Sequence, residues 1–119
     1  MSPSQPVAPR RSEVWMANTG GKKHAIVIIS PDSRNLSDRA TSILAVPFGS
    51  FGRSGPTVIV MQPGETGLPV TSFLKAHYIQ VIQKSDLIGQ LPRRLSRAQM
   101  KSLVAAVNRA IDPDALLSQ

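Results

Sequence analysis

Short apolar runs separated by turn residues fill most of the chain as far as residue 82. The run at residues 13–17 is followed by the turn residues Asn18-Thr19-Gly20-Gly21. The run at residues 25–29 is almost wholly apolar and β-branched, which is typical of a strand buried on both faces. Further strands are predicted at residues 42–47, 57–61, about 71–76 and about 79–82. Short strands with glycine and proline turns between them indicate a small β-barrel.

The pattern changes to a helical one after residue 95. Ser96 and Gln99 stand at the positions of a capping box, and Leu95 and Met100 at those of a hydrophobic staple. The i, i+3, i+4 spacing of a core-facing helix is then followed by Met100, Leu103, Val104, Val107 and Ile111. Asp112-Pro113 ends the helix, because the residue before a proline disfavours helical geometry. We expect this helix to cover the barrel with its apolar stripe in the core.

With 119 residues, the chain is long enough for one domain with a modest core. Residues 1–11, with three prolines, are predicted to be a flexible tail, and residues 12–119 the single folded domain. The first residues lack the apolar core of a signal peptide, and no apolar stretch approaches the roughly 20 residues that span a bilayer. We therefore expect a soluble, cytoplasmic protein without a membrane partner.

Charge and cysteine content narrow the chemistry. Fourteen lysines and arginines against seven acidic residues give a net charge of +7, which favours polyanionic partners. The absence of cysteine excludes disulfides, thiol catalysis and cysteine-ligated zinc. No spacing of His, Asp and Glu resembles a metal site, so no metal or other cofactor is expected.

Both histidines of the chain lie beside lysine. His24 follows Lys22-Lys23 at the start of an apolar run, and His77 follows Lys75-Ala76. Imidazole transfers protons near neutral pH, and a lysine beside it suits a phosphate. On the predicted strand, Lys75 and His77 would share one face, about 7 Å apart, with Ala76 turned into the core. The two pairs on a basic chain indicate nucleic-acid chemistry.

Six segments resemble, in the same order, the MazF/PemK-like family of toxin endoribonucleases from toxin–antitoxin pairs. They are Arg10-Arg11-Ser12-Glu13-Val14-Trp15, Ala-Ile-Val-Ile-Ile-Ser-Pro-Asp at 25–32, Ile-Leu-Ala-Val-Pro at 43–47, Gly-Leu-Pro-Val-Thr-Ser at 67–72, Lys-Ser-Asp-Leu-Ile-Gly at 84–89, and Leu95-Ser96. The resemblance covers roughly residues 11–111. It implies an SH3-like β-barrel of the MazF/PemK/CcdB type with a C-terminal α-helix, working as a homodimer.

The resemblance also implies a function, that of an mRNA interferase. Such an enzyme cuts single-stranded RNA at short sequences without a metal. The ribose 2′-hydroxyl attacks the neighbouring phosphate and leaves a 2′,3′-cyclic phosphate and a 5′-hydroxyl end. The implied protein partner is a cognate antitoxin, and DNA would be bound only through the antitoxin complex.

The sequence departs from the family at the positions expected to do the chemistry. His24-Ala25 stands where the family usually has Arg-Pro, Gly49-Ser50 where it has Thr-Ser or Thr-Thr, and Lys75-Ala76-His77 where some members have Arg-x-Asp. Two histidines can serve as base and acid without a metal. The expected catalytic residues are therefore His24, Ser50 and His77. The expected RNA-binding residues are Lys22, Lys23, Phe51, Arg53 and Lys75.

Simpler interpretations stand beside these. His24 could be a solvated loop residue, His77 a strand histidine satisfied locally or at a dimer interface, and Phe51 a side chain tucked into the barrel mouth. A solvated surface is the simplest interpretation of the basic cluster formed by Arg93, Arg94, Arg97 and Lys101. The altered site could also be inactive and only bind RNA or antitoxin. A gyrase poison on the same fold ranks last, because it would need a C-terminal tryptophan and the only tryptophan is Trp15.

Overall fold

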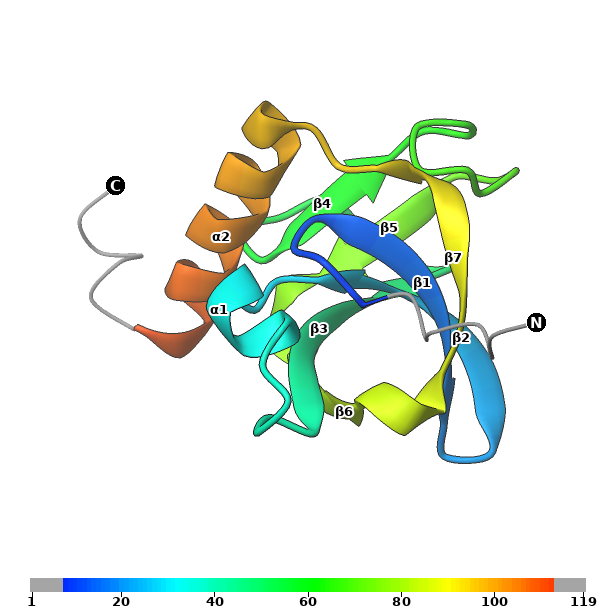
Figure 1. Cartoon of the computed structure of the whole chain (residues 1–119). Helices are drawn as coiled ribbons and strands as arrows, with labels where there is room; N and C mark the ends of the chain where they lie inside the picture. The colour runs from blue at the N-terminus through cyan, green and yellow to red at the C-terminus, as the bar shows by residue number, and fades with distance from the viewer. Residues whose placement is uncertain (1–7, 113–119) are drawn as a thin grey trace.

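The computed structural model describes residues 8–112, in which seven strands are followed by a long helix (Figure 1). The strands are β1 Glu13–Thr19, β2 Lys22–Ile28, β3 Ser42–Gly49, β4 Val58–Met61, β5 Ser72–Lys75, β6 Gln80–Gln83 and β7 Leu87–Arg94. The helical elements are the single turn α1 Asp32–Asn35, the 3₁₀ turns η1 Ala76–Tyr78 and η2 Lys84–Asp86, and α2 Arg97–Ile111. The expected class, mainly β with a C-terminal helix, is confirmed.

The strands form one curled antiparallel sheet in the order β4-β5-β3-β2-β1-β7, with β6 pairing to the first half of β3. Gly20 and Gly21 join β1 to β2 as a two-residue turn with φ of 59° and 81°, which glycine adopts without steric cost. Within residues 8–112 no pairing joins β4 to β7, so hydrogen bonds do not close the sheet into a full ring.

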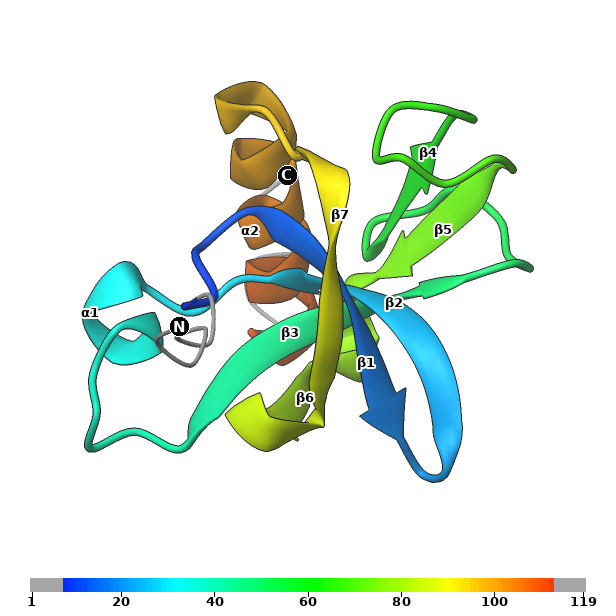
Figure 2. The same ribbon diagram turned by 45° about the vertical axis from the view of Figure 1, so that its right-hand side comes forward.

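Strand β3 divides the sheet into two arms. Its middle pairs with β2, where Ile26 faces Pro47, but its last residues Phe48 and Gly49 pair with β5. Beyond Ile26, the start of β2 pairs only with β1. Figure 2 shows the resulting separation of the β1–β2 hairpin from the β4–β5 hairpin. His24 lies on one arm of this fork, and Lys75 with the loop after β3 lies on the other.

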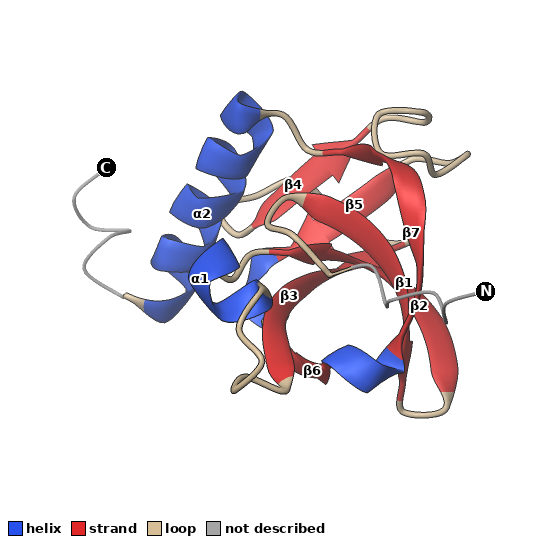
Figure 3. Ribbon diagram, in the orientation of Figure 1, coloured by secondary structure: helices blue, strands red, loops and turns tan. Residues whose placement is uncertain are grey.

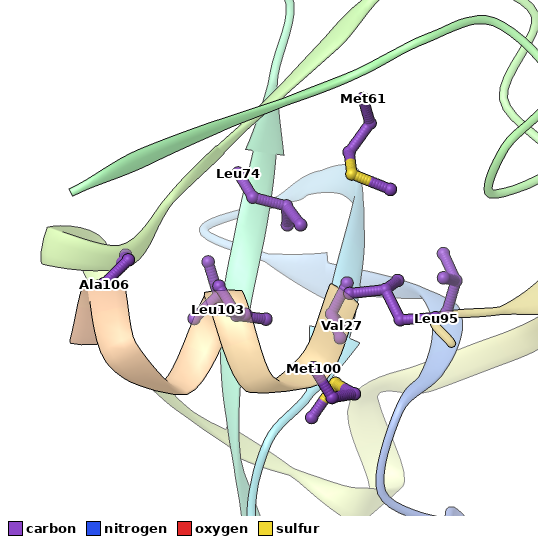
Figure 4. Close-up of a cluster of buried hydrophobic side chains, with 10 residues drawn as sticks. Val27, Met61, Leu74, Leu95, Met100, Leu103 and Ala106 are labelled. Atoms are coloured by element: carbon purple, nitrogen blue, oxygen red, sulfur yellow. The ribbon is translucent and has the colours of Figure 1, made fainter. Parts of the chain in front are cut away.

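Alternating residues of the strands fill two buried clusters on opposite faces of the sheet. The cluster under α2 contains Val14, Val27, Val46, Met61, Leu74, Ala76, Leu95, Met100, Leu103 and Ala106, most of which Figure 4 labels. The cluster on the other face contains Trp15, Ala17, Ile26, Ile28, Ile43, Ala45 and Ile82. The expected burial of the second strand on both faces is thus confirmed, and Trp15 is a core residue.

Helix α2 lies along one side of the strands (Figure 3) and begins as predicted. The backbone N–H of Gln99 donates to Ser96 Oγ at 3.1 Å, and the N–H of Ser96 donates to Gln99 Oε1 at 2.7 Å, which completes the capping box. The predicted stripe is wrong at its end, because Ile111 is 67% exposed. The buried residues Met100, Leu103 and Ala106 are three positions apart. Because a helix has 3.6 residues per turn, the surface that contacts the sheet shifts around the helix and no longer includes Ile111.

Three further details of the secondary structure differ from, or add to, the sequence prediction. Strand β7 was not predicted; it is an end strand of the sheet, a position where a proline such as Pro92 is tolerated. His77 lies in η1, so its predicted place on a strand is wrong. At the N-terminus, residues 1–7 of the predicted tail lie outside the described residues. Of the remainder, Arg10 and Arg11 are held through backbone N–H bonds to Glu13 and Asp32.

No helix within residues 8–112 is both long and apolar enough to cross a membrane.

Candidate functional site

Lys75, the last residue of β5, is held in a slot between two glycines. Its neighbour Leu74 packs under α2, so strand alternation turns the Lys75 side chain to the opposite face of the sheet. A Cβ atom on Gly49 would lie 3.2 Å from Lys75 Cε and 3.4 Å from Nζ. A Cβ on Gly52, where φ is 151°, would lie 3.5 Å from Lys75 Cε and 3.3 Å from Phe73 Cγ. Glycine at both positions lets the ammonium group pass beside the end of β3.

The turn η1 places His77 and Tyr78 next to this ammonium group. The buried Ala76 donates its N–H to the carbonyl of Thr57 at 2.8 Å, and this fixes where η1 begins. The rings of His77 and Tyr78 lie 4.5 Å apart at a tilt of 45°, and Lys75 Nζ lies 5.9 Å from the Tyr78 ring centre. The turn in the chain, rather than strand alternation, thus brings the side chains of Lys75, His77 and Tyr78 into one cluster.

His77 shares a hydrogen bond with Thr57, whose Oγ1 lies 2.9 Å from His77 Nδ1. Both side chains reach solvent, so Nε2 of His77 can meet a ligand. If the hydroxyl donates to Nδ1, the ring is neutral and Nε2–H can only donate a hydrogen bond. If the hydroxyl accepts from Nδ1–H, Nε2 is the base of the neutral ring and the acid of the protonated ring. This arrangement positions the imidazole for either half of a proton transfer.

His24 lies on the second arm, exposed near the start of β2 and opposite Ala17 of β1. Alternation with the buried Ile26 places His24 on the same face of the sheet as Lys75, together with Lys22, whereas Lys23 points to the other face. Within the described part of the chain, no hydrogen bond or ion pair holds the imidazole of His24. It therefore stands free at the fork where β2 and β3 part.

Ser50, Phe51 and Arg53 lie in the exposed loop that follows β3. The Phe51 side chain is 81% exposed, so the interpretation that it tucks into the barrel mouth is wrong. The loop leads from Gly49 to Thr57 and returns to the sheet at the bridge between Gly55 and Val58. Both ends of this loop thus touch the Lys75–His77 cluster.

Thr57 and Tyr78 were not singled out from the sequence. Tyr78 stands directly after a candidate histidine, which is a usable signal in a basic chain. Thr57 is 20 positions from His77, and the pairing of Val58 with Lys75 alone brings it near. No local sequence pattern contains that information.

The segments that build this face contain no carboxylate. Between Glu13 and Asp32, between Asp38 and Glu65, and between Glu65 and Asp86 the sequence has neither Asp nor Glu. These segments therefore supply only basic and neutral side chains, although Asp86 lies beside Thr19 and Gly20 at the tip of the β1–β2 hairpin. Exposed aromatic rings beside the basic side chains suit the stacking of unpaired bases. Within residues 8–112, no three His, Cys, Asp or Glu side chains gather where they could hold one metal ion.

Comparison with known proteins identifies the family. Residues 10–111 match the sequence profile of the PemK-like, MazF-like toxins of type II toxin–antitoxin systems. The chain belongs to this toxin family. Among curated protein sequences, none matches this chain with significance.

Solved structures of two endoribonucleases and of a MazF toxin have the same fold. An endoribonuclease from a mycobacterial species, in complex with its cognate antitoxin, shares 26% identity at a TM-score of 0.75, over 87% of this chain and 95% of that one. A second mycobacterial endoribonuclease shares 25% identity at a TM-score of 0.73, over 87% of this chain and 91% of that one. The Mycobacterium tuberculosis toxin MazF-mt6 shares 21% identity at a TM-score of 0.74, over 84% and 96%.

Proposed function

We propose that this MazF-like toxin is a sequence-specific endoribonuclease that cuts single-stranded RNA without a metal ion. The observation that carries the proposal is the Lys75–His77–Tyr78 cluster, on a face that a free histidine, His24, shares. Family membership supports the same activity, since two similar structures are endoribonucleases.

The reaction needs a base, an acid and a cation around one phosphate. One histidine takes the proton from the ribose 2′-hydroxyl, whose oxygen then bonds to phosphorus. The bond from phosphorus to the 5′-oxygen breaks, and the other histidine gives that oxygen its proton. Products are a 2′,3′-cyclic phosphate and a 5′-hydroxyl end. His24 and His77 fill these two roles, in an order that the proposal leaves open.

The remaining residues hold the RNA. The Lys75 ammonium, fixed by its glycine slot, neutralises the phosphate oxygens, and the Ser50 hydroxyl donates a hydrogen bond to one of them. Lys22 and Arg53 contact neighbouring phosphates, while Phe51 stacks on a base. Lys23, which points to the other face of the sheet, contacts the RNA only where the strand passes the edge of the hairpin. Tyr78 joins this set as a second stacking surface beside the scissile phosphate.

Partners form part of the proposal. The toxin acts as a homodimer and is inhibited by a cognate antitoxin, as expected from the similar mycobacterial endoribonuclease that is bound to its own antitoxin. An acidic and apolar antitoxin segment would lie across this basic face and block RNA from it. DNA would be contacted only through that complex.

A second candidate function is RNA or antitoxin binding without catalysis. It is favoured by one observation: no neighbour among the described residues orients the His24 imidazole, whereas catalytic bases are usually positioned by a partner. Affinity for RNA without any cleavage would support this alternative.

The test is incubation of the purified protein with a long unstructured RNA in EDTA, followed by mapping of fragment ends. Discrete cuts with 5′-hydroxyl ends, at equal rates with EDTA and with Mg²⁺, are the expected result. Intact RNA, or cleavage that EDTA abolishes, would overturn the proposal.

A further inference from the structure

A basic cavity lies on the side of the sheet that α2 covers. Its volume is about 710 Å³. Its walls come from the segment before β1, the start of α1, the end of β7 and the first two turns of α2. The lining residues are Arg11, Ser12, Asp32, Arg94, Leu95, Arg97, Met100, Lys101 and Val104.

The shape of this cavity is fixed by the segment before β1. Ser12 has a φ of 77°, which is unusual for a residue with a side chain. Hydrogen bonds to both its backbone N–H and its carbonyl hold it in this conformation. Its N–H donates to the carbonyl of Ile28 at 2.8 Å, and its carbonyl accepts from the N–H of Leu95 at 2.9 Å. The guanidinium of Arg94 donates to Ser12 Oγ at 2.8 Å and to the carbonyl of Arg11 at 2.7 Å. The cavity is therefore formed before any ligand binds.

Positive charge dominates the cavity. Four cationic side chains line it against one carboxylate, that of Asp32. Oxygen Oδ1 of Asp32 already accepts from the backbone N–H of Arg11 at 2.7 Å and from Asn35 Nδ2 at 3.0 Å. The exposed Arg97 and Lys101 form no ion pair with any residue in the range 8–112. The cavity thus presents two uncompensated cations, beside an Arg94 held by uncharged partners.

Apolar side chains form the floor between these cations. Leu95 and Met100 belong to the buried cluster under α2, and Val104 is half-buried beside them. The lining includes no aromatic side chain on which a base could stack, a feature that single-stranded RNA sites rely on. The combination of an apolar floor and a cationic rim matches a peptide better than an RNA strand.

We propose that this cavity binds a segment of a partner protein in which carboxylates flank a leucine-sized side chain. The apolar side chain lies on the floor, and the carboxylates pair with Arg97 and Lys101 at the rim. The cavity lies on the α2 side, whereas Lys75 and His24 face the other side of the sheet. The inference therefore does not depend on RNA cleavage, and peptide and RNA can be bound at once.

The probe is the synthetic peptide Ac-Leu-Glu-Glu-Leu-Leu-Glu-Asp-Leu-amide, titrated into the ¹⁵N-labelled full chain and followed by amide chemical shifts. We expect saturable shifts at Leu95, Met100 and Lys101. A matched peptide with Gln and Asn in place of Glu and Asp should bind at least about tenfold more weakly. Shifts confined to other residues, no shifts, or equal binding of the neutral peptide would overturn the proposal.

Two variants separate a specific site from bulk charge. Lys101→Glu and Arg39→Glu change the net charge equally and affect exposed residues, but only Lys101 lines the cavity. Lys101→Glu should weaken peptide binding about tenfold, and Arg39→Glu should change it by less than about twofold. Equal losses would overturn the proposal. If an oligouridylate shifts these amide signals and the peptide does not, the cavity is an RNA site and the proposal is wrong. The proposal is also wrong if the amide shifts scale with protein concentration, because the occupant is then a second copy of the chain.

Discussion

The Lys75 side chain passes so close to Gly49 that a Cβ atom there would lie 3.2 Å from Lys75 Cε and 3.4 Å from Nζ. Because Gly49 at the end of β3 has no side chain, the Lys75 side chain at the end of β5 can lie against its backbone. This contact fixes the position of the Lys75 ammonium group. The face opposite α2 gains a cation with a defined position, beside an imidazole whose Nδ1 is held by Thr57.

Replacing Gly49 by alanine should displace this ammonium group. The group that must move is the flexible end of Lys75, so the fold should persist. The ammonium group, however, would no longer lie where it binds the phosphate best. We expect RNA cleavage to fall about tenfold. Gly55→Ala, in the same loop but with no atom within 4 Å of its Cβ, is the matched control and should cleave normally. Equal rates for both variants would mean that the position of Lys75 is unimportant.

Removing the Thr57 hydroxyl should affect the reaction only through His77. Thr57→Val keeps the shape and deletes the hydrogen bond to Nδ1, which is worth about 0.5–1.5 kcal/mol. The cleavage rate should fall by up to about tenfold, and its pH profile should shift. In a His77→Ala background the same substitution should have no further effect. Additive losses in the double variant would show that Thr57 acts independently of the histidine.

The corrected orientation of α2 can be tested by stability. Leu103 is fully buried between helix and sheet, so Leu103→Ala should lower the free energy of unfolding by about 2–5 kcal/mol. Ile111→Ala, at a position that is 67% exposed, should change it by no more than about 0.5 kcal/mol. Urea denaturation measures both. A large decrease in the free energy of unfolding for Ile111→Ala would show that Ile111 is part of the buried face, as the sequence pattern predicted.

The capping box gives a second stability prediction. Ser96→Ala removes the hydroxyl that accepts from Gln99 and should cost about 1 kcal/mol. Ser102→Ala, on the exposed face of the same helix, is the control and should be neutral or slightly stabilising. If the two variants have the same urea midpoint, the cap contributes nothing.

Asp32 should contribute to acid sensitivity. The hydrogen bond from the backbone N–H of Arg11, above all, holds the pKa of Asp32 below its usual value of 3.8, against the opposing effect of desolvation; Asn35 and the nearby Arg10 and Arg94 also lower it. A carboxyl whose pKa is depressed on folding stabilises the fold above its unfolded-state pKa, and this contribution is lost as the pH falls through the lower folded-state value. The stability difference between the native chain and Asp32→Asn should therefore be present at pH 7 and shrink below about pH 4. A difference that is independent of pH would contradict this assignment.

Much of the fold is readable from local sequence patterns. The first six strands and α2 follow from hydrophobic runs, glycine and proline turns, and the Ser96–Gln99 pair. Strand β7 lacks such a pattern because, at the end of the sheet, it alternates half-buried and exposed residues and tolerates Pro92. The burial of Ala106 in place of Ile111 depends on how the helix crosses the sheet, which no helical periodicity specifies.

The site is less readable than the fold, because its contacts join distant segments. Lys75 and His77 are close in sequence, yet a 3₁₀ turn, and not a strand, sets their geometry. The partners Gly49, Gly52 and Thr57 reach them only through the pairing of β3 and β4 with β5. A sequence can therefore nominate the histidines and lysines, but the residues that hold them come from sheet register.

The most direct test of the account compares RNA cleavage in EDTA by the native chain, His24→Ala, His77→Ala and Arg39→Ala. Thermal unfolding and RNA affinity are measured on the same samples. We expect each histidine variant to lose at least about a hundredfold in rate while it stays folded and still binds RNA, and Arg39→Ala to cleave normally. Cleavage that persists at the native rate in both histidine variants would show that the reaction does not take place at this face.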